Sequence, residues 1–115
     1  MTDRAIAAVA RQYDAYNARD ADAYAACYAA DCVVAALHGS VVMRGAASLR
    51  DRYAGIFERH PANRTTLINR IALGNVVIDH EHVRRGSDED SFEIVAIYTV
   101  KDDHIARVDF IKKET

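Results

Sequence analysis

Apolar side chains recur at helical spacing in three stretches of the N-terminal half of the chain. The first stretch can be capped by Thr2 or Asp3, and the polar residues 17–20 interrupt it. Its apolar face consists of Ile6, Val9, Ala10, Tyr13 and Tyr16. Asp20 or Asp22 can cap a second, short helix. The face shared by its larger side chains consists of Tyr24, Cys27 and Tyr28.

A third helical pattern begins at Gly45 and ends at Pro61, the only proline of the chain. The helix ends there because the residue before a proline is pushed out of the helical region. Its apolar stripe consists of Leu49, Tyr53, Ile56 and Phe57. The pattern therefore predicts three helices before Pro61.

Strand-type patterns make up the rest of the chain. Residues 31–37 and 41–43 predict two strands joined by a turn at 38–40. After Pro61 the predicted strands cover residues 64–73, 76–84, 91–100 and 105–112. A polar loop at 85–90 separates the middle two. Helices followed by antiparallel strands predict an α+β fold with the helices on one face of the sheet.

The turn at Gly74-Asn75 sets the register of the first long hairpin, because this pair tolerates the positive φ of a two-residue turn. One face then carries Asn69, Ile71, Leu73, Val76, Ile78 and His80. The opposite face carries Ile68, Arg70, Ala72, Val77, Asp79 and Glu81. We predict that the first face meets the core, because it is more apolar near the hairpin tip. This choice puts His80 among apolar neighbours and leaves Arg70, Asp79 and Glu81 as a charge cluster outside.

The second hairpin turns at residues 101–104, and its register stays open. A two-residue turn would set Arg107 and Asp109 beside Tyr98. A bulged turn would set Val108 and Phe110 there instead.

Composition narrows the class of protein. The length of 115 residues fits a single domain over residues 1–115. The net charge of −2, with no Lys/Arg block, argues against a nucleic-acid or anionic-membrane partner. No apolar stretch reaches the ~20 residues of a membrane span, and no signal-peptide pattern begins the chain, so we expect a cytoplasmic protein. Cys27 and Cys32 stand among apolar residues, so we expect both to be small, buried, free thiols. The five histidines are scattered along the chain and do not predict a metal site.

An ordered set of segments resembles the NTF2-like superfamily, in its ketosteroid-isomerase-like and SnoaL-like branch. The set consists of residues 13–17, 20–28, 30–34, 44–53 and 69–81. The resemblance spans nearly the whole chain. It implies a cone in which three N-terminal helices pack on a curved antiparallel or mixed sheet. It also implies a homodimer through the outer sheet face, where we place Ile68, Val77 and Val83.

The resemblance suggests roles for individual residues. Tyr13 matches the tyrosine that donates to the substrate oxygen in ketosteroid isomerases, and Tyr28 and Tyr53 match its supporting tyrosines. Ala36 stands where these enzymes carry the aspartate that moves the proton. Their second oxygen-binding acid falls at Ala96 or at Tyr98, depending on the gap in the last hairpin.

We therefore predict a cofactor-free protein whose apolar pocket takes a small molecule. It resembles an isomerase or cyclase that works through an enol or enolate. Because Ala36 cannot act as a base, His80 is the candidate base, with Tyr13 as donor and Tyr98 as second donor. Further candidate pocket residues are Tyr28, Tyr53, His38 and Phe57. The alternatives are a ligand-binding domain without catalysis and a dimerisation module.

Overall fold

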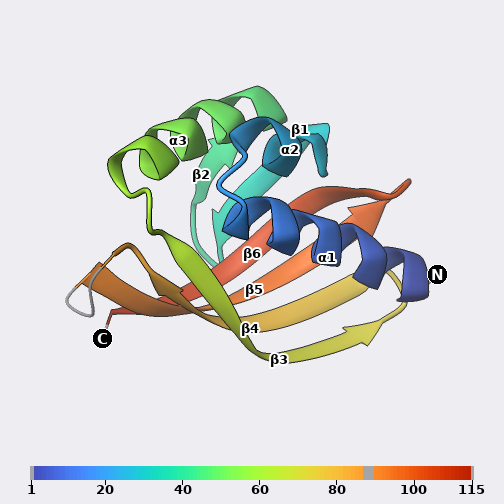
Figure 1. The fold of residues 1–115 in the computed structure, drawn as a ribbon. Helices are drawn as coiled ribbons and strands as arrows, with labels where there is room; N and C mark the ends of the chain where they lie inside the picture. Colours follow the sequence, from blue (N-terminus) through green and yellow to red (C-terminus); the bar gives the residue numbers. More distant parts are fainter. Residues whose placement is uncertain (1, 87–89, 115) are drawn as a thin grey trace.

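The protein folds into one sheet with three helices on its concave side (Figure 1). This computed structural model describes residues 2–86 and 90–114, and residues 87–89 of the predicted polar loop lie outside the described part. The elements are α1 (Thr2–Asn17), α2 (Ala21–Ala26), β1 (Tyr28–Ala36), β2 (Val41–Arg44), α3 (Ala46–Arg59), β3 (Arg64–Leu73), β4 (Val76–Arg84), β5 (Ser91–Lys101) and β6 (His104–Glu114). None of the described helices is long and apolar enough to cross a membrane.

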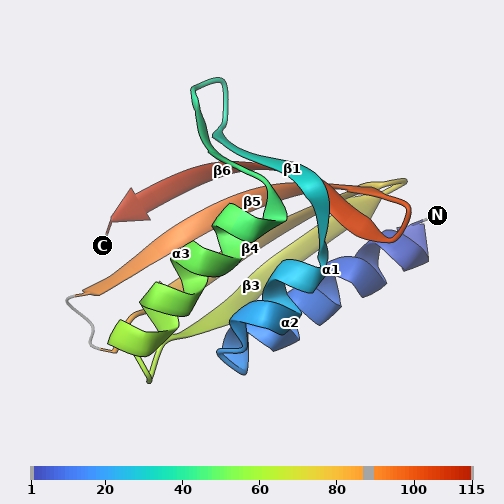
Figure 2. The same ribbon diagram turned by 90° about the horizontal axis from the view of Figure 1, so that it is seen from above.

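The sheet is mixed, with strand order β2-β1-β6-β5-β4-β3. All neighbouring strands run antiparallel except β1 and β6, which are parallel. Seen from above, α1 runs alongside β3, at the edge of the sheet away from β1 and β2 (Figure 2). The predicted α+β class, with three helices on a curved mixed sheet, is confirmed. We call the face under the helices the inner face and the opposite face the outer face.

Several helix boundaries lie at residues whose side chain or backbone conformation favours the start of a helix. The Asp20 side chain caps α2 by accepting a hydrogen bond of 3.0 Å from the Ala23 amide. Gly45, with φ of 89°, precedes α3 in a conformation that disfavours other residues. The predicted helical position of Tyr28 is wrong, because α2 ends at Ala26 and Tyr28 pairs with Ile105 in the parallel ladder. A six-residue helix has little stability of its own, so tertiary pairing decides where it ends.

The first long hairpin has the predicted register at its tip, where Leu73 pairs with Val76. Continued unchanged from the turn, this register would pair Leu67 with His82. A bulge at Ile68 shifts it, and Leu67 pairs with Glu81. The shift begins beyond the Gly74-Asn75 turn, which fixes only the pairs near it.

The predicted choice of core face is wrong. Val77 and Asp79 are fully buried on the inner face, whereas Ile71 and Leu73 are 62% and 83% exposed on the outer face. The helix α1 packs over β3, β4 and β5 and buries whichever side chains point toward it. His80 consequently points outward, and Glu81 points inward. The predicted outer positions of Val77 and Val83 are wrong for the same reason.

The last hairpin combines the two-residue turn of one alternative with the strand pairing of the bulged one. Asp102 and Asp103, both with positive φ, form the turn between the paired Lys101 and His104. A bulge between Thr99 and Val100 then sets Tyr98 opposite Val108 and Ala96 opposite Phe110. Tyr98 and Val108 are buried together, and the Arg107–Asp109 pair lies apart from them.

Aromatic rings fill the space between the helices and the inner face. Tyr24 lies with its ring centre 4.8 Å from that of Tyr53 and 5.2 Å from that of Tyr28. Both cysteines are free thiols, as predicted, but only Cys32 is fully buried, and Cys27 is half-buried. The core is therefore largely aromatic where it meets α2 and α3.

Candidate functional site

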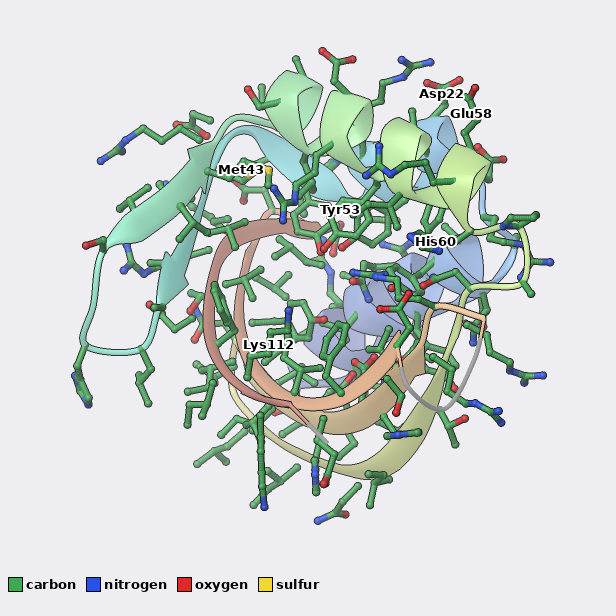
Figure 3. The ribbon with its side chains drawn as sticks, turned by 90° about the vertical axis from the view of Figure 1, so that its left-hand side faces the viewer. Asp22, Met43, Tyr53, Glu58, His60 and Lys112 are labelled. Atoms are coloured by element: carbon green, nitrogen blue, oxygen red, sulfur yellow. The ribbon has the colours of Figure 1, made fainter. Side chains whose placement is uncertain are left out.

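A cavity of about 250 Å³ lies between the inner face, β2 and α3. Figure 3 looks along the sheet toward it, with Tyr53 of α3 and Lys112 of β6 on opposite sides. Its other lining residues are Tyr24, Tyr28, Val34, Val42, Met43, Leu49, Arg52, Arg85, Phe92, Ile94, Ala96, Tyr98, Val108 and Phe110. Most of this wall is aromatic or aliphatic, as in sites that hold small apolar molecules.

A smaller chamber of about 70 Å³ adjoins the cavity at its inner end. The two spaces share seven lining residues: Tyr24, Tyr53, Arg85, Phe92, Ile94, Ala96 and Tyr98. The chamber adds polar residues that the cavity lacks: Gln12, Tyr13, Thr65 and Glu81. The carboxyl group of Glu81 and the neutral polar side chains of Gln12 and Thr65 therefore lie in the chamber, whereas the charged side chains of the cavity wall are cationic.

Glu81 of β4 is the buried carboxyl group of this chamber, and only 6% of it is exposed. The Thr65 hydroxyl donates a hydrogen bond of 2.7 Å to its Oε1 atom. Burial raises the pKa of Glu81 above the usual range of a glutamate, and the negative charge of Asp79 adds to this. The Thr65 hydrogen bond and the Arg70 charge oppose the rise. A carboxyl group of this kind is suited to taking up and releasing protons.

Asp79 lies two residues before Glu81 on the same face and is fully buried. Arg70 of β3 binds it through two hydrogen bonds, Nε to Oδ1 at 2.7 Å and Nη2 to Oδ2 at 2.9 Å. The predicted cross-strand pairing of Arg70 with Asp79 is confirmed, but its predicted place on the outer face is wrong. This ion pair is thus part of the interior, close to Glu81 on the same strand.

Gln12 of α1, in the inner chamber, joins the hydroxyls of two tyrosines of the cavity wall. Its Oε1 atom accepts hydrogen bonds from Tyr28 at 3.0 Å and from Tyr98 at 3.3 Å. The Tyr24 hydroxyl lies 3.0 Å from that of Tyr28 and continues the network. Burial raises the pKa of Tyr28 and of Tyr98 well above the usual value, so both hydroxyls stay protonated and act as donors.

Three of the predicted site residues line this space. Tyr28, Tyr53 and Tyr98 all contribute to the cavity wall. Tyr13 lines the inner chamber, but its hydroxyl donates to the Thr65 carbonyl and accepts from the Leu67 amide, both at 3.2 Å. Tyr13 thereby ties α1 to β3.

The other predicted site residues lie elsewhere. His80 is on the outer face, where its Nε2 atom lies 2.8 Å from Oε1 of Glu93. The prediction of His80 as the base facing the pocket is therefore wrong. His38 sits in the exposed turn after β1 with φ of 57°. Phe57 is buried behind the cavity wall, with its ring 5.8 Å from that of Tyr53.

Two residues of this candidate site, Glu81 and Gln12, were not predicted as site residues from the sequence. Strand alternation offers a signal for Glu81, because it faces inward once His80 faces outward. Gln12 has a helical signal, because it lies three residues after Val9 and four before Tyr16 on the apolar stripe. Among the described residues, no group of three His, Cys, Asp or Glu side chains is arranged to hold a metal ion.

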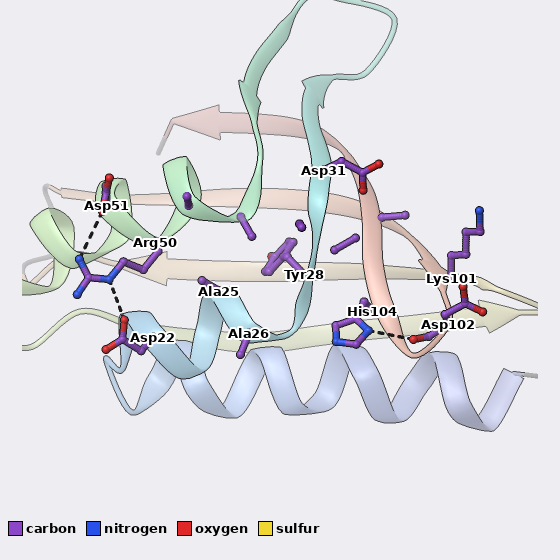
Figure 4. A pocket seen from close by; sticks show the side chains of 15 residues that line it. Asp22, Ala25, Ala26, Tyr28, Asp31, Arg50, Asp51, Lys101, Asp102 and His104 are labelled. Atoms are coloured by element: carbon purple, nitrogen blue, oxygen red, sulfur yellow. Dashed lines mark hydrogen bonds and ion pairs between the residues drawn. The ribbon is translucent and has the colours of Figure 1, made fainter.

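A larger hollow of about 920 Å³ opens between α2, α3, β1 and the β5–β6 turn (Figure 4). It is a wide surface groove with several alanines on its floor. Arg50, a charged residue of the groove, forms ion pairs with both Asp22 and Asp51. Because the carboxyl groups that line the groove are all exposed, we place the candidate site in the cavity under α3 instead.

Comparison with known proteins agrees with this architecture. Residues 9–108 match the model of a family described as the SnoaL-like domain. An uncharacterised cystatin-fold protein from Novosphingobium aromaticivorans is 32% identical, with a TM-score of 0.85 over 96% of this chain and 98% of that chain. A search of curated protein sequences finds no significant match.

Two further solved structures carry functional descriptions. A candidate ketosteroid isomerase from Kribbella flavida has a TM-score of 0.81 and 20% identity, over 99% of this chain and 81% of that chain. A candidate polyketide cyclase from Sinorhizobium meliloti has a TM-score of 0.74 and 19% identity, over 90% and 93% of the two chains. At these identities the likeness concerns the fold alone.

Proposed function

Because the chain belongs to the family of SnoaL-like domains, we propose that its cavity binds a small, largely apolar molecule that carries a carbonyl group. In this proposal Glu81 moves a proton at the carbon beside the carbonyl, as an isomerase or cyclase would. The observation that carries it is the buried Glu81 carboxyl, with its raised pKa, at the inner end of an aromatic cavity.

The proposed step begins with the Glu81 carboxylate, which removes a proton from the carbon next to the carbonyl. The electron pair of that bond moves into an enolate, whose oxygen needs a hydrogen-bond donor. Tyr98 is the proposed donor, because its 3.3 Å bond to Gln12 is long and easily exchanged for a ligand oxygen. Tyr28 and Tyr53 would support it from the adjoining wall.

The enolate then has two outcomes. In an isomerase, Glu81 returns the proton to another carbon of the conjugated system. In a cyclase, the enolate carbon attacks a second carbonyl of the same molecule, and the new alkoxide takes the proton from Glu81. Both outcomes balance without an external oxidant or reductant. The functional descriptions of the Kribbella and Sinorhizobium proteins fit these two reactions.

The proposal is tested by measuring the turnover of enone and β-keto compounds through the change in their ultraviolet absorbance. Glu81→Gln should lower kcat by about 10²–10⁴-fold while the protein stays folded. Glu93→Gln is the matched control, because this carboxyl lies on the next strand beside the outward-facing His80. Equal turnover in the Glu81 variant and in the wild type would refute the assigned base.

The second candidate function is a ligand-binding domain without catalysis. Two observations favour it: Ala36 stands at the position of the isomerase base, and the hydroxyls of Tyr13, Tyr28 and Tyr98 are already bonded within the protein. A compound that raises the melting temperature but is never converted, in wild type as in Glu81→Gln, would favour this candidate.

We also propose that two copies pair through the outer face. The exposed apolar side chains there include Ile68, Ile71, Leu73 and Ile111. Exposed apolar groups that cluster on one sheet are typical of interaction surfaces. This set replaces Val77 and Val83, which lie inside.

A further inference from the structure

The charged side chains that line the cavity are all positive among the described residues. Arg52 comes from α3, Arg85 from the loop after β4, and Lys112 from β6. No described Asp or Glu lines this space, although the chain as a whole has a net charge of −2. The positive charge is therefore a local property of the cavity.

Arg85 is held in place by neutral groups. Its Nη1 atom donates to the Tyr16 hydroxyl at 2.9 Å and to Oδ1 of Asn63 at 2.8 Å. Its guanidinium carbon also lies 5.2 Å from the centre of the Phe92 ring. Arg85 is half-buried, and the side chains that it hydrogen-bonds are neutral. Glu81 lines the same inner chamber, but no described ion pair joins the two residues. A partly buried cation of this kind is stabilised by a nearby negative charge. An anion bound in the cavity would supply that charge.

Arg52 and Lys112 extend this positive region on either side. Lys112 places its Nζ atom 4.2 Å from the centre of the same Phe92 ring. Arg52 is exposed and makes no ion pair with any described residue. Cations from three separate elements thus converge on one aromatic-walled space, where guanidinium groups bind carboxylates through paired hydrogen bonds.

We propose that the ligand of this cavity is an apolar molecule with a carboxylate, bound by Arg52 and Arg85 with Lys112 nearby. The inference rests on the proposed function, because it assumes that the cavity is the ligand site. The carboxylate lies at the positively charged wall, and the apolar body extends between Tyr53 and Tyr98 toward Glu81. Like-charge repulsion keeps the carboxylate away from Glu81 itself.

Two probes of nearly the same shape test this: 2-naphthoate, which is ionised near neutral pH, and the neutral ketone 2-acetylnaphthalene. Calorimetry should show that the wild-type protein binds the carboxylate about tenfold more tightly than the ketone. Raising the salt concentration should reduce that preference, because ions screen exposed charges. Arg52→Gln and Arg85→Gln should each remove most of the preference and leave the affinity for the ketone within about twofold.

Arg59→Gln is the matched control, because this arginine lies on the same helix and does not line the cavity. Arg52→Gln should leave the fold intact, because Arg52 is exposed and makes no ion pair with any described residue. This variant therefore still tests the proposal if Arg85→Gln fails to fold. Equal binding of ketone and carboxylate by the wild type would overturn the carboxylate inference and leave the proposed function standing. Failure of both probes to bind would instead count against the cavity as the ligand site, and the inference would fall with it.

Discussion

The Thr65 hydroxyl donates a hydrogen bond of 2.7 Å to Oε1 of Glu81, across two neighbouring strands and inside the protein. This bond stabilises the charged form of Glu81, whereas burial and the negative charge of Asp79 destabilise it. The proton affinity of the proposed base is therefore set by a balance that single substitutions can shift.

Thr65→Val should raise the pKa of Glu81 further, because it removes a bond that lowers it. The proposed base works when deprotonated, so activity is lost as pH falls through this pKa. In the variant, the loss should therefore begin at a higher pH than in the wild type. The pH dependence of kcat/KM measures this shift, with Thr66→Val, an exposed neighbour, as control. If kcat/KM fell at the same acidic pH in the variant and in the wild type, the role of Glu81 would be contradicted.

Gln12→Leu should destabilise the fold by about 1–3 kcal/mol, because it removes the acceptor of the Tyr28 and Tyr98 hydroxyls. Denaturant unfolding measures the change. When Tyr98 is already replaced by Phe, Gln12→Leu should lower the free energy of unfolding by less. The Tyr98 hydroxyl, one of the two donors that lose their acceptor, is then absent. Strictly additive losses would show that the Gln12–Tyr98 bond contributes nothing to stability.

Arg70→Met should cost about 3–5 kcal/mol of stability, because it leaves the fully buried Asp79 without its counter-ion. Adding Asp79→Leu should restore most of the loss, since the pair is then replaced by apolar groups. The Arg70 charge lowers the pKa of Glu81. In Arg70→Met alone, activity should therefore be lost at a higher pH than in the wild type as the solution is made more acidic. Calorimetric unfolding and the pH profile check the two effects separately.

Leu73→Asp should dissociate the proposed dimer and leave the fold of each copy intact. Leu73 is 83% exposed, so the substitution should change monomer stability by less than about 0.5 kcal/mol. Light scattering after size-exclusion chromatography gives the mass. Val42→Asp is the control, because this valine is also exposed, at 58%, but lies beside the cavity. A wild-type mass of one copy at all concentrations would rule out the outer-face dimer.

The local signals of the sequence were sufficient for most element boundaries. The Asp20 cap, the Gly74-Asn75 turn and the break at Pro61 each depend on the conformational preferences of a few neighbouring residues. Such preferences act in any tertiary context, so the order of helices and strands was predictable. The resemblance to a known superfamily then added the cone and the tyrosines Tyr28, Tyr53 and Tyr98 of its wall.

The facing of the strands was decided only by the tertiary structure. Strand side chains alternate, so both faces of the β3–β4 hairpin were compatible with the sequence, and the apolar Ile71 and Leu73 favoured the wrong one. The position of α1 over the sheet made Asp79 and Glu81 interior and His80 exterior. That position results from long-range packing among elements, which no short stretch of the chain encodes. The sequence by itself thus determined the elements and their order, and the packing of the helices determined which ionisable group became the candidate base.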